Sequence, residues 1–84
     1  MPRYFFDIDD AGSGPDTVGT ELKDLTEAKC EGVKMAGRII CDQASQFWDR
    51  AEWNMTVSDE TRLTMFTLHV VGIESAAASK PPRP

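Results

Sequence analysis

The sequence is poor in cysteine and in aromatic residues, and it has no long apolar run. Its two cysteines, Cys30 and Cys41, are too few for a disulfide framework or a four-ligand zinc site. The longest near-apolar stretch, residues 63–73, is interrupted by two threonines, a histidine and a glycine, whereas a membrane span needs about 20 apolar residues. The opening turns acidic at Asp7, too early for a signal peptide. These features predict a cytoplasmic protein with no membrane partner and no disulfide scaffold.

Positive charge is also scarce. Nine lysines and arginines stand against fourteen aspartates and glutamates, which gives a net charge of −5. No basic stripe exists outside the last ten residues, so we expect no nucleic-acid partner. At 84 residues the chain predicts one domain, and a chain of this size buries only about 60 % of its unfolded surface. We therefore expect association with itself or with a partner protein.

Alternating apolar and polar residues predict the strands of a sheet. Residues 3–8, 53–58 and 63–71 alternate with a period of two, and turn formers separate them from their neighbours. Residues 18–22 predict a shorter second strand, which Gly19 weakens.

One long helix is predicted to begin after Asp24. The Asp24 carboxylate can accept hydrogen bonds from first-turn amides, and Glu27 completes a variant of the capping box. Gly32 falls within the apolar stripe, where we expect the helix to approach the sheet closely. Residues 44–52 predict an irregular connection. The stripe itself recurs at helical spacing through Leu25, Ala28, Gly32, Met35, Ala36, Ile39 and Ile40, and it reaches Phe47 if the helix continues that far.

These elements predict an α+β fold of order β(β)αββ. Three or four antiparallel strands form the sheet, and the one long helix packs on a single face. Residues 1–74 make the single domain, and residues 75–84 are a disordered C-terminal tail, because they offer no large apolar side chain to bury.

A single helix leaves the second face of the sheet without cover, and this predicts an interface. We expect one apolar row of each outer strand to lie beneath the helix, namely Tyr4, Phe6 and Ile8 with Phe66, Leu68 and Val70. The opposite rows then expose apolar side chains, which favours a homodimer through a sheet face or a sheet edge. The predicted interface residues are Phe5, Met65, His69, Val71, Trp48 and Trp53.

No complete set of catalytic or metal-binding residues emerges. The acidic turn that starts at Asp7 has calcium-loop spacing at its first positions, but Val18 occupies the place of the decisive bidentate glutamate. His69 has no positioned nucleophile or orienting carboxylate in its sequence context. Cys30 and Cys41 do not lie at a helix N-terminus. We therefore predict no catalytic residue, no metal, no cofactor and no enzymatic activity.

Four short motifs resemble a known family. They are the opening Met-Pro-Arg-Tyr-Phe-Phe-Asp-Ile of residues 1–8, Gly-Thr-Glu-Leu at 19–22, Asp-Leu at 24–25, and Trp-x-Met-x-Val-x-Asp-Glu at 53–60. This pattern resembles a family of short alphaproteobacterial proteins classed as a domain of unknown function. The resemblance covers about residues 2–71 and implies no activity.

Two positions depart from that family pattern. Lys23 stands where a proline is usual, and the turn before the last strand lacks the usual glycine, which predicts an altered turn geometry at Thr61. The order of elements alone also resembles the start of antitoxins of the HicB type, which neutralise small toxins. The sequence thus favours a protein–protein interaction module, with an antitoxin-like regulator that binds a toxin partner as the alternative.

Overall fold

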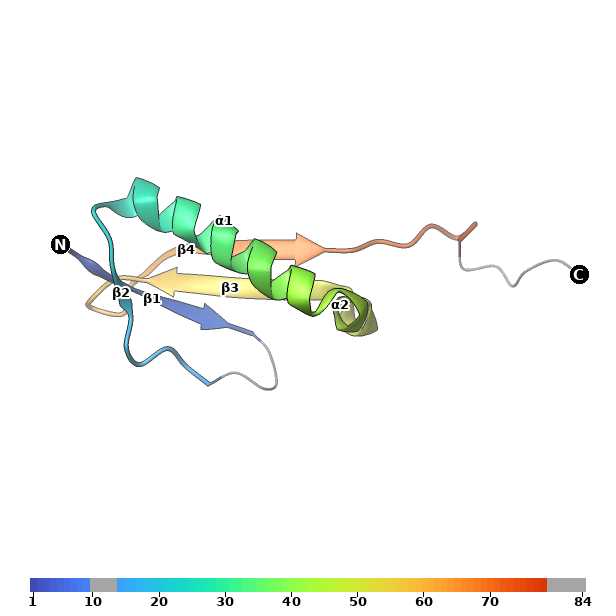
Figure 1. Ribbon diagram of the computed structural model, residues 1–84, viewed down its shortest axis with the longest axis horizontal. Coiled ribbons are helices and arrows are strands. Elements are labelled where there is room, and N and C mark those ends of the chain that lie inside the picture. The colour runs from blue at the N-terminus through green and yellow to red at the C-terminus, as the bar shows by residue number, and fades with distance from the viewer. Residues whose placement is uncertain (10–13, 79–84) are drawn as a thin grey trace, which may run out of the picture.

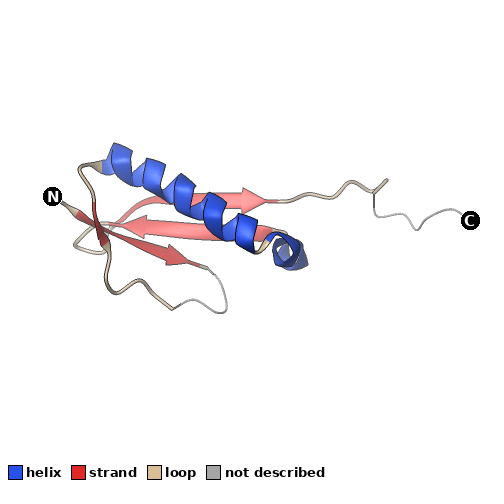
Figure 2. Ribbon diagram, in the orientation of Figure 1, coloured by secondary structure: helices blue, strands red, loops and turns tan. Residues whose placement is uncertain are grey.

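The computed structural model describes residues 1–9 and 14–78 of the chain (Figure 1). Four antiparallel strands form one sheet in the order β2-β1-β3-β4, and α1 crosses one of its faces (Figure 2). The predicted α+β class and the antiparallel sheet are confirmed. In chain order the elements are β1 (Arg3–Ile8), β2 (Thr20–Glu21), α1 (Leu25–Asp42), α2 (Ala44–Arg50), β3 (Glu52–Ser58) and β4 (Thr64–Val71).

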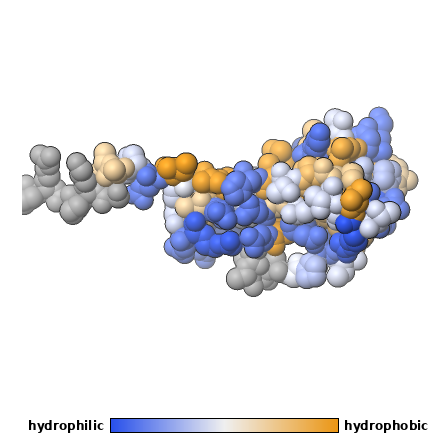
Figure 3. All heavy atoms as spheres, turned by 180° about the vertical axis from the view of Figure 1, so that it is seen from behind, coloured by the Kyte–Doolittle hydropathy of each residue, from blue (hydrophilic) through white to orange (hydrophobic). Residues whose placement is uncertain are grey.

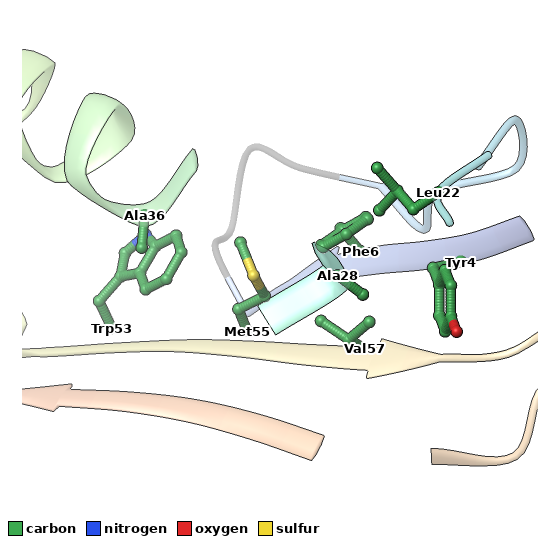
Figure 4. Packing of buried hydrophobic residues seen from close by; sticks show 8 residues of the cluster. All are labelled: Tyr4, Phe6, Leu22, Ala28, Ala36, Trp53, Met55 and Val57. Atoms are coloured by element: carbon green, nitrogen blue, oxygen red, sulfur yellow. The ribbon is translucent and has the colours of Figure 1, made fainter. Parts of the chain in front are cut away.

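The register of the sheet aligns the apolar rows beneath α1. Phe6 lies opposite Val57, and Val57 lies opposite Phe66 on the other side. Met55 and Val57 are fully buried at the centre, and the half-buried residues of β4 pack against the same cluster. The predicted placement of these rows beneath the helix is confirmed, but Met65, predicted on the opposite face, packs against the core, where the pairing of β3 with β4 shifts register between Val57 and Ser58. Figure 4 shows the eight buried apolar residues of this core, which are Tyr4, Phe6, Leu22, Ala28, Ala36, Trp53, Met55 and Val57.

The helix α1 begins where its capping residues predict. The Asp24 carboxylate accepts a hydrogen bond of 2.9 Å from the Glu27 amide. The Glu27 carboxylate in turn accepts from the Lys23 amide at 3.3 Å. Gly32 faces the sheet, where a Cβ atom would come to 3.4 Å from the Phe66 ring, so the helix approaches closely as expected. The cap and the stripe together fix where α1 starts and which side it buries.

Removal of the cap is expected to destabilise the protein modestly. Asp24→Ala deletes the acceptor of the Glu27 amide, and loss of such a cap costs about 1 kcal/mol. Chemical denaturation of the variant checks this. Thr26→Ala is the matched control, because Thr26 is exposed within the helix and should lose nothing. An equal loss in both variants would mean that the cap contributes no more than the surface of the first turn.

The irregular connection predicted for residues 44–52 is wrong. This stretch contains the helix α2. Gln43 separates it from α1, because its backbone angles of φ −115° and ψ 31° are not helical, although its amide still donates to the carbonyls of Ile39 and Ile40. Ala51 adopts the left-handed conformation with φ 55° and ends α2. The helix escaped prediction because its two large apolar residues are adjacent in sequence, which leaves no helical period to detect.

Two turns also differ from expectation. The second strand spans only Thr20–Glu21, because Gly19 has φ 74° and turns the chain just before it. In the hairpin between β3 and β4, Arg62 and not Thr61 takes the left-handed conformation, with φ 68°. The Asp59 carboxylate holds this turn by accepting from the amides of Thr61 and Leu63 at 2.8 and 3.1 Å.

Candidate functional site

The face of the sheet opposite α1 is less apolar than the sequence predicts. The Arg62 guanidinium lies 3.7 Å above the centre of the Phe5 ring and covers it. The same guanidinium donates to the Asp16 carbonyl at 3.0 Å and lies 3.8 Å from the Asp7 carboxylate. Phe5 is therefore half-buried and engaged within the chain, which argues against it as an interface residue.

The rest of that face carries mainly polar side chains. Thr56 and Thr67 lie opposite each other, and so do Asn54 and His69. His69 is exposed, and its Nδ1 forms a hydrogen bond with the Asn54 side-chain oxygen. Together with Phe5 beneath its cover, this leaves no continuous apolar patch on this face within the described residues.

The other predicted interface residues divide between core and surface. Trp53 is a correction, since only 5 % of it is exposed and it packs in the core beneath α1. Met65 is half-buried and packs against the same core. Trp48 and Val71 are exposed at 57 % and 47 %. The sequence places Trp53 near Phe47 and Trp48, an aromatic concentration typical of a core edge or a protein interface, and the alternation of β3 turns Trp53 into the core.

The Asp16 carboxylate, which the sequence did not single out, binds an outward amide of β1 at one edge of the sheet. The Asp16 carboxylate accepts hydrogen bonds from the amides of Phe6 at 3.0 Å, Val18 at 3.1 Å and Gly19 at 2.9 Å. Its own amide donates to the Asp7 carboxylate at 2.7 Å. The sequence carried a signal for part of this contact, because Asp16 stands among turn-forming residues. In an Asx turn, an aspartate side chain accepts from a backbone amide two or three residues further along the chain.

The environment of Asp16 keeps it ionised. Burial raises the pKa of this carboxyl. Hydrogen bonds from the backbone amides of Gly19, Phe6 and Val18, together with the nearby Arg62 charge, lower the pKa by more than burial raises it. The net result is a pKa below the ordinary 3.8. The pKa of Asp59 is also lowered, chiefly by the Thr61 hydroxyl and then by the amides of its turn. Both carboxylates thus organise loops.

The predicted calcium-type turn lies partly outside the described residues, which omit 10–13. On either side of that gap, Asp7 and Asp16 are engaged with groups of the chain itself. Over residues 1–9 and 14–78, no three histidine, cysteine or acidic side chains are grouped to hold a metal ion. Cys30 and Cys41 are both exposed free thiols. Within that same part of the chain, no helix combines the length and the apolar character needed to cross a membrane.

A pocket of about 250 Å³ opens where the end of α1, α2 and β3 meet. Two of its charged lining residues are paired, because the Arg50 guanidinium donates to the Asp9 carbonyl at 3.1 Å and to the Asp9 carboxylate at 3.3 Å. Trp53 lines the pocket, and its buried Nε1 has no hydrogen-bond partner among the described residues. The pocket therefore offers hydrophobic contacts, two glutamines, an internal ion pair and the Glu52 carboxylate.

Exposed apolar side chains gather where β4 ends. They are Trp48, Val71 and Ile73, and Ile73 is 86 % exposed. The Trp48 ring meets Phe47 edge to face with centroids 5.5 Å apart. It also lies against Gly72, where a Cβ atom would come within 2.7 Å of the ring. Figure 3, which views the molecule from behind, shows hydrophobic surface along the upper margin, where the chain leaves the sheet.

The strand β4 forms an open edge of the sheet. It is the last strand in the order, and no strand of the described chain pairs with its outer side. The Gly72 amide donates inward to the Ala51 carbonyl at 2.8 Å. Because hydrogen-bonding direction alternates along an antiparallel strand, Thr67, His69 and Val71 point their backbone amides and carbonyls outward. The eight residues of β4 include no proline and no lysine, arginine, aspartate or glutamate.

These features define a small α+β domain. At one edge of its sheet, the two-residue β2 and the Asp16 carboxylate cover β1, and we call this edge closed. At the other edge, the eight-residue β4 is open. Comparison with protein families identifies the chain as a member of a family described as a domain of unknown function (DUF6894), whose model matches residues 3–71. The resemblance predicted from the opening motifs is thereby confirmed at the level of a family without an assigned function. Neither the search of curated proteins nor the search of solved structures gave a match.

Proposed function

We propose that this chain is a non-enzymatic protein–protein interaction module that takes up an extended strand of a partner on the open edge of β4. The observation that carries the proposal is the outer side of β4, an uncharged, proline-free row whose backbone groups pair with no strand among residues 1–9 and 14–78. Such an edge is a template for another strand, and addition of a strand is a recurring mode of protein recognition.

The contrast between the two edges supports this role. At the β1 edge, β2 pairs with Arg3 and Tyr4, and the Asp16 carboxylate takes up the next outward amide, that of Phe6. Natural proteins commonly protect edges with short strands, charges or proline. The described chain applies such devices at β1 and none along the outer side of β4. An edge left open beside a closed one favours a binding role for it.

The chemistry of the described residues also favours binding over catalysis. The two carboxylates with shifted pKa values, Asp16 and Asp59, are both held in the ionised form by hydrogen bonds within the chain, from backbone amides to Asp16 and chiefly from the Thr61 hydroxyl to Asp59. A general acid or base needs instead a pKa near the working pH. The single histidine is engaged with Asn54 on the open sheet face. The antitoxin-like alternative stays a prediction from the order of elements.

A peptide that copies β4 tests the proposed function. The probe is residues 64–71 with two added lysines at each end for solubility, titrated in excess into the isotopically labelled chain at a concentration where light scattering gives the single-chain mass of 9.3 kDa, so that no second copy occupies the edge. We expect slower hydrogen exchange at the outward amides of Thr67, His69 and Val71, with little change at the inward amides of Leu68 and Val70. A peptide of the same composition in scrambled order is the control. No protection at the outward amides, or equal protection by both peptides, contradicts the proposal.

A further inference from the structure

We infer that the strand taken up by β4 is the β4 strand of a second copy of this chain, paired antiparallel across a two-fold axis. The inference rests on the proposed function and names its partner. It joins two four-stranded sheets into one continuous sheet of a closed homodimer. Three features of β4 support this partner over an unrelated extended peptide: its register, its exposed apolar ends and its lack of charge.

The register of β4 allows it to pair with itself. Thr67, His69 and Val71 are the outward residues, and they are evenly spaced about His69. An antiparallel pair centred on His69 sets His69 opposite its own copy and Thr67 opposite Val71. Every outward residue then exchanges hydrogen bonds with the second strand. On the helix face, Leu68 of one copy meets Val70 of the other.

The apolar row beneath α1 is incomplete at this edge. Phe66, Leu68 and Val70 pack against the core, yet all three remain only half-buried. Their strand is the last of the sheet, so no further strand flanks them on the outer side. A second copy supplies that strand with the same apolar residues on the same face. Burial of this remaining apolar surface favours the pair.

Exposed apolar residues also lie at both ends of β4. Leu63, which is 62 % exposed, precedes the strand, Val71 is its last residue, and Ile73 follows it. An antiparallel partner brings the beginning of one strand beside the end of the other. In the register centred on His69, Ile73 lies opposite Met65 of the second copy.

The lack of charge on β4 favours pairing with a second copy of the chain, and the covered second edge of the sheet limits the assembly to two copies. The net charge of −5 resides outside β4, which carries no acidic or basic side chain apart from its histidine, so the two edges meet without like charges between them. The other edge is closed by β2 and Asp16. A molecule with one open edge forms a closed two-fold dimer, whereas two open edges would propagate a fibre.

Light scattering coupled to size exclusion tests the inference on the full chain. The wild type is expected to approach twice the single-chain mass of 9.3 kDa as its concentration rises through the micromolar range. Thr67→Pro removes one outward amide, which proline can replace at an edge without loss of the inner ladder. We expect this variant to dimerise at least about tenfold more weakly. Thr67→Ala keeps the amide and is expected to remain a dimer.

A second pair of variants keeps the test valid if Thr67→Pro fails to fold. His69→Lys places a positive charge opposite its own copy at the centre of the seam, where the two copies repel. Asn54→Lys adds the same charge to the same sheet face on the neighbouring strand, away from the edge, and loses the same contact between Asn54 and His69. Weaker dimerisation of His69→Lys alone supports the inference. Equal dimerisation of His69→Lys and Asn54→Lys overturns it, because the interface then lies elsewhere.

The two proposals fail in distinguishable ways. A wild-type mass of 9.3 kDa at all concentrations overturns the homodimer. If the lysine-tagged β4 peptide still protects the amides of Thr67, His69 and Val71 in that monomer, the strand-binding function stands with a different partner. If neither dimer nor peptide protection is found, both proposals fall.

Discussion

Met55→Ala is expected to lower the free energy of unfolding by about 3 kcal/mol, within the range typical of buried methionine truncations. Met55 is fully buried at the centre of the core, between the strands and α1. Its sulfur would lie 3.6 Å from a Cβ atom placed on Gly32, so the side chain fills the gap beneath the helix. Alanine leaves a cavity that the closely approaching helix cannot easily fill.

Urea denaturation at one fixed chain concentration checks this value, because dimerisation would make the apparent stability depend on concentration. Met35→Ala is the matched control, since Met35 is a half-buried methionine on α1 that packs at the margin of the same core. We expect it to lose less than half as much. Equal losses in the two variants would contradict the central role of Met55.

Asp16→Asn is expected to destabilise the protein by about 2 kcal/mol at neutral pH. The carboxylate accepts three backbone hydrogen bonds, and hydrogen bonds to a charged group contribute about 1.5–3 kcal/mol each where they are buried. The partial exposure of Asp16 reduces this sum. Asparagine keeps the size of the side chain but loses the charge and one of the two acceptor oxygens. The amides of Phe6, Val18 and Gly19 then compete for a single acceptor.

The pH dependence of stability follows from the direction of the pKa shift. The pKa of Asp16 is lower in the folded chain than the ordinary 3.8, because hydrogen bonds from backbone amides outweigh the effect of burial. The folded state therefore binds the proton less readily than the unfolded state. Its stabilising contribution is complete above the ordinary pKa and disappears as the pH falls through the lowered folded value.

Denaturation of the wild type and Asp16→Asn between pH 7 and pH 2 checks both statements. The difference in stability between the two proteins is expected to be largest near neutral pH and to shrink in the acid range. Asp49→Asn is the control, because Asp49 is exposed on α2 without a hydrogen bond or ion pair among the described residues. A difference that stays constant down to pH 2 would assign the loss to the shape of the side chain and not to its charge.

The local patterns of the sequence determined most of the secondary structure. Alternation in residues 3–8 and 53–58 and the aspartate before the helix predicted elements that the structure contains with boundaries shifted by no more than one residue. Such patterns are reliable because alternation and capping depend on residues close together along the chain. The helix α2 was missed because its seven residues are too few to show a helical period in the sequence.

The sequence determined less of the candidate site. It predicted exposed positions for Val71, His69 and Trp48, and the structure places all three on the surface. It also predicted that Phe5 and Trp53 contribute to an interface. Arg62 covers the first, and the core buries the second. The sequence could not show these two contacts, because the side chains that cover Phe5 and Trp53 come from segments that are distant in sequence.

Only the tertiary structure decided which edge of the sheet stays open. Arg62 reaches Phe5 across 57 positions of sequence, the difference between their numbers, and Asp16 reaches Phe6 across a loop of ten. Neither contact has a local signature, because each depends on the pairing of strands that are distant in sequence. The alternation of β4 could be read from its own residues, but its place at the end of the sheet follows from the insertion of β3 between β1 and β4. That topology is set by the burial of three apolar rows beneath one helix, which is a property of the whole domain.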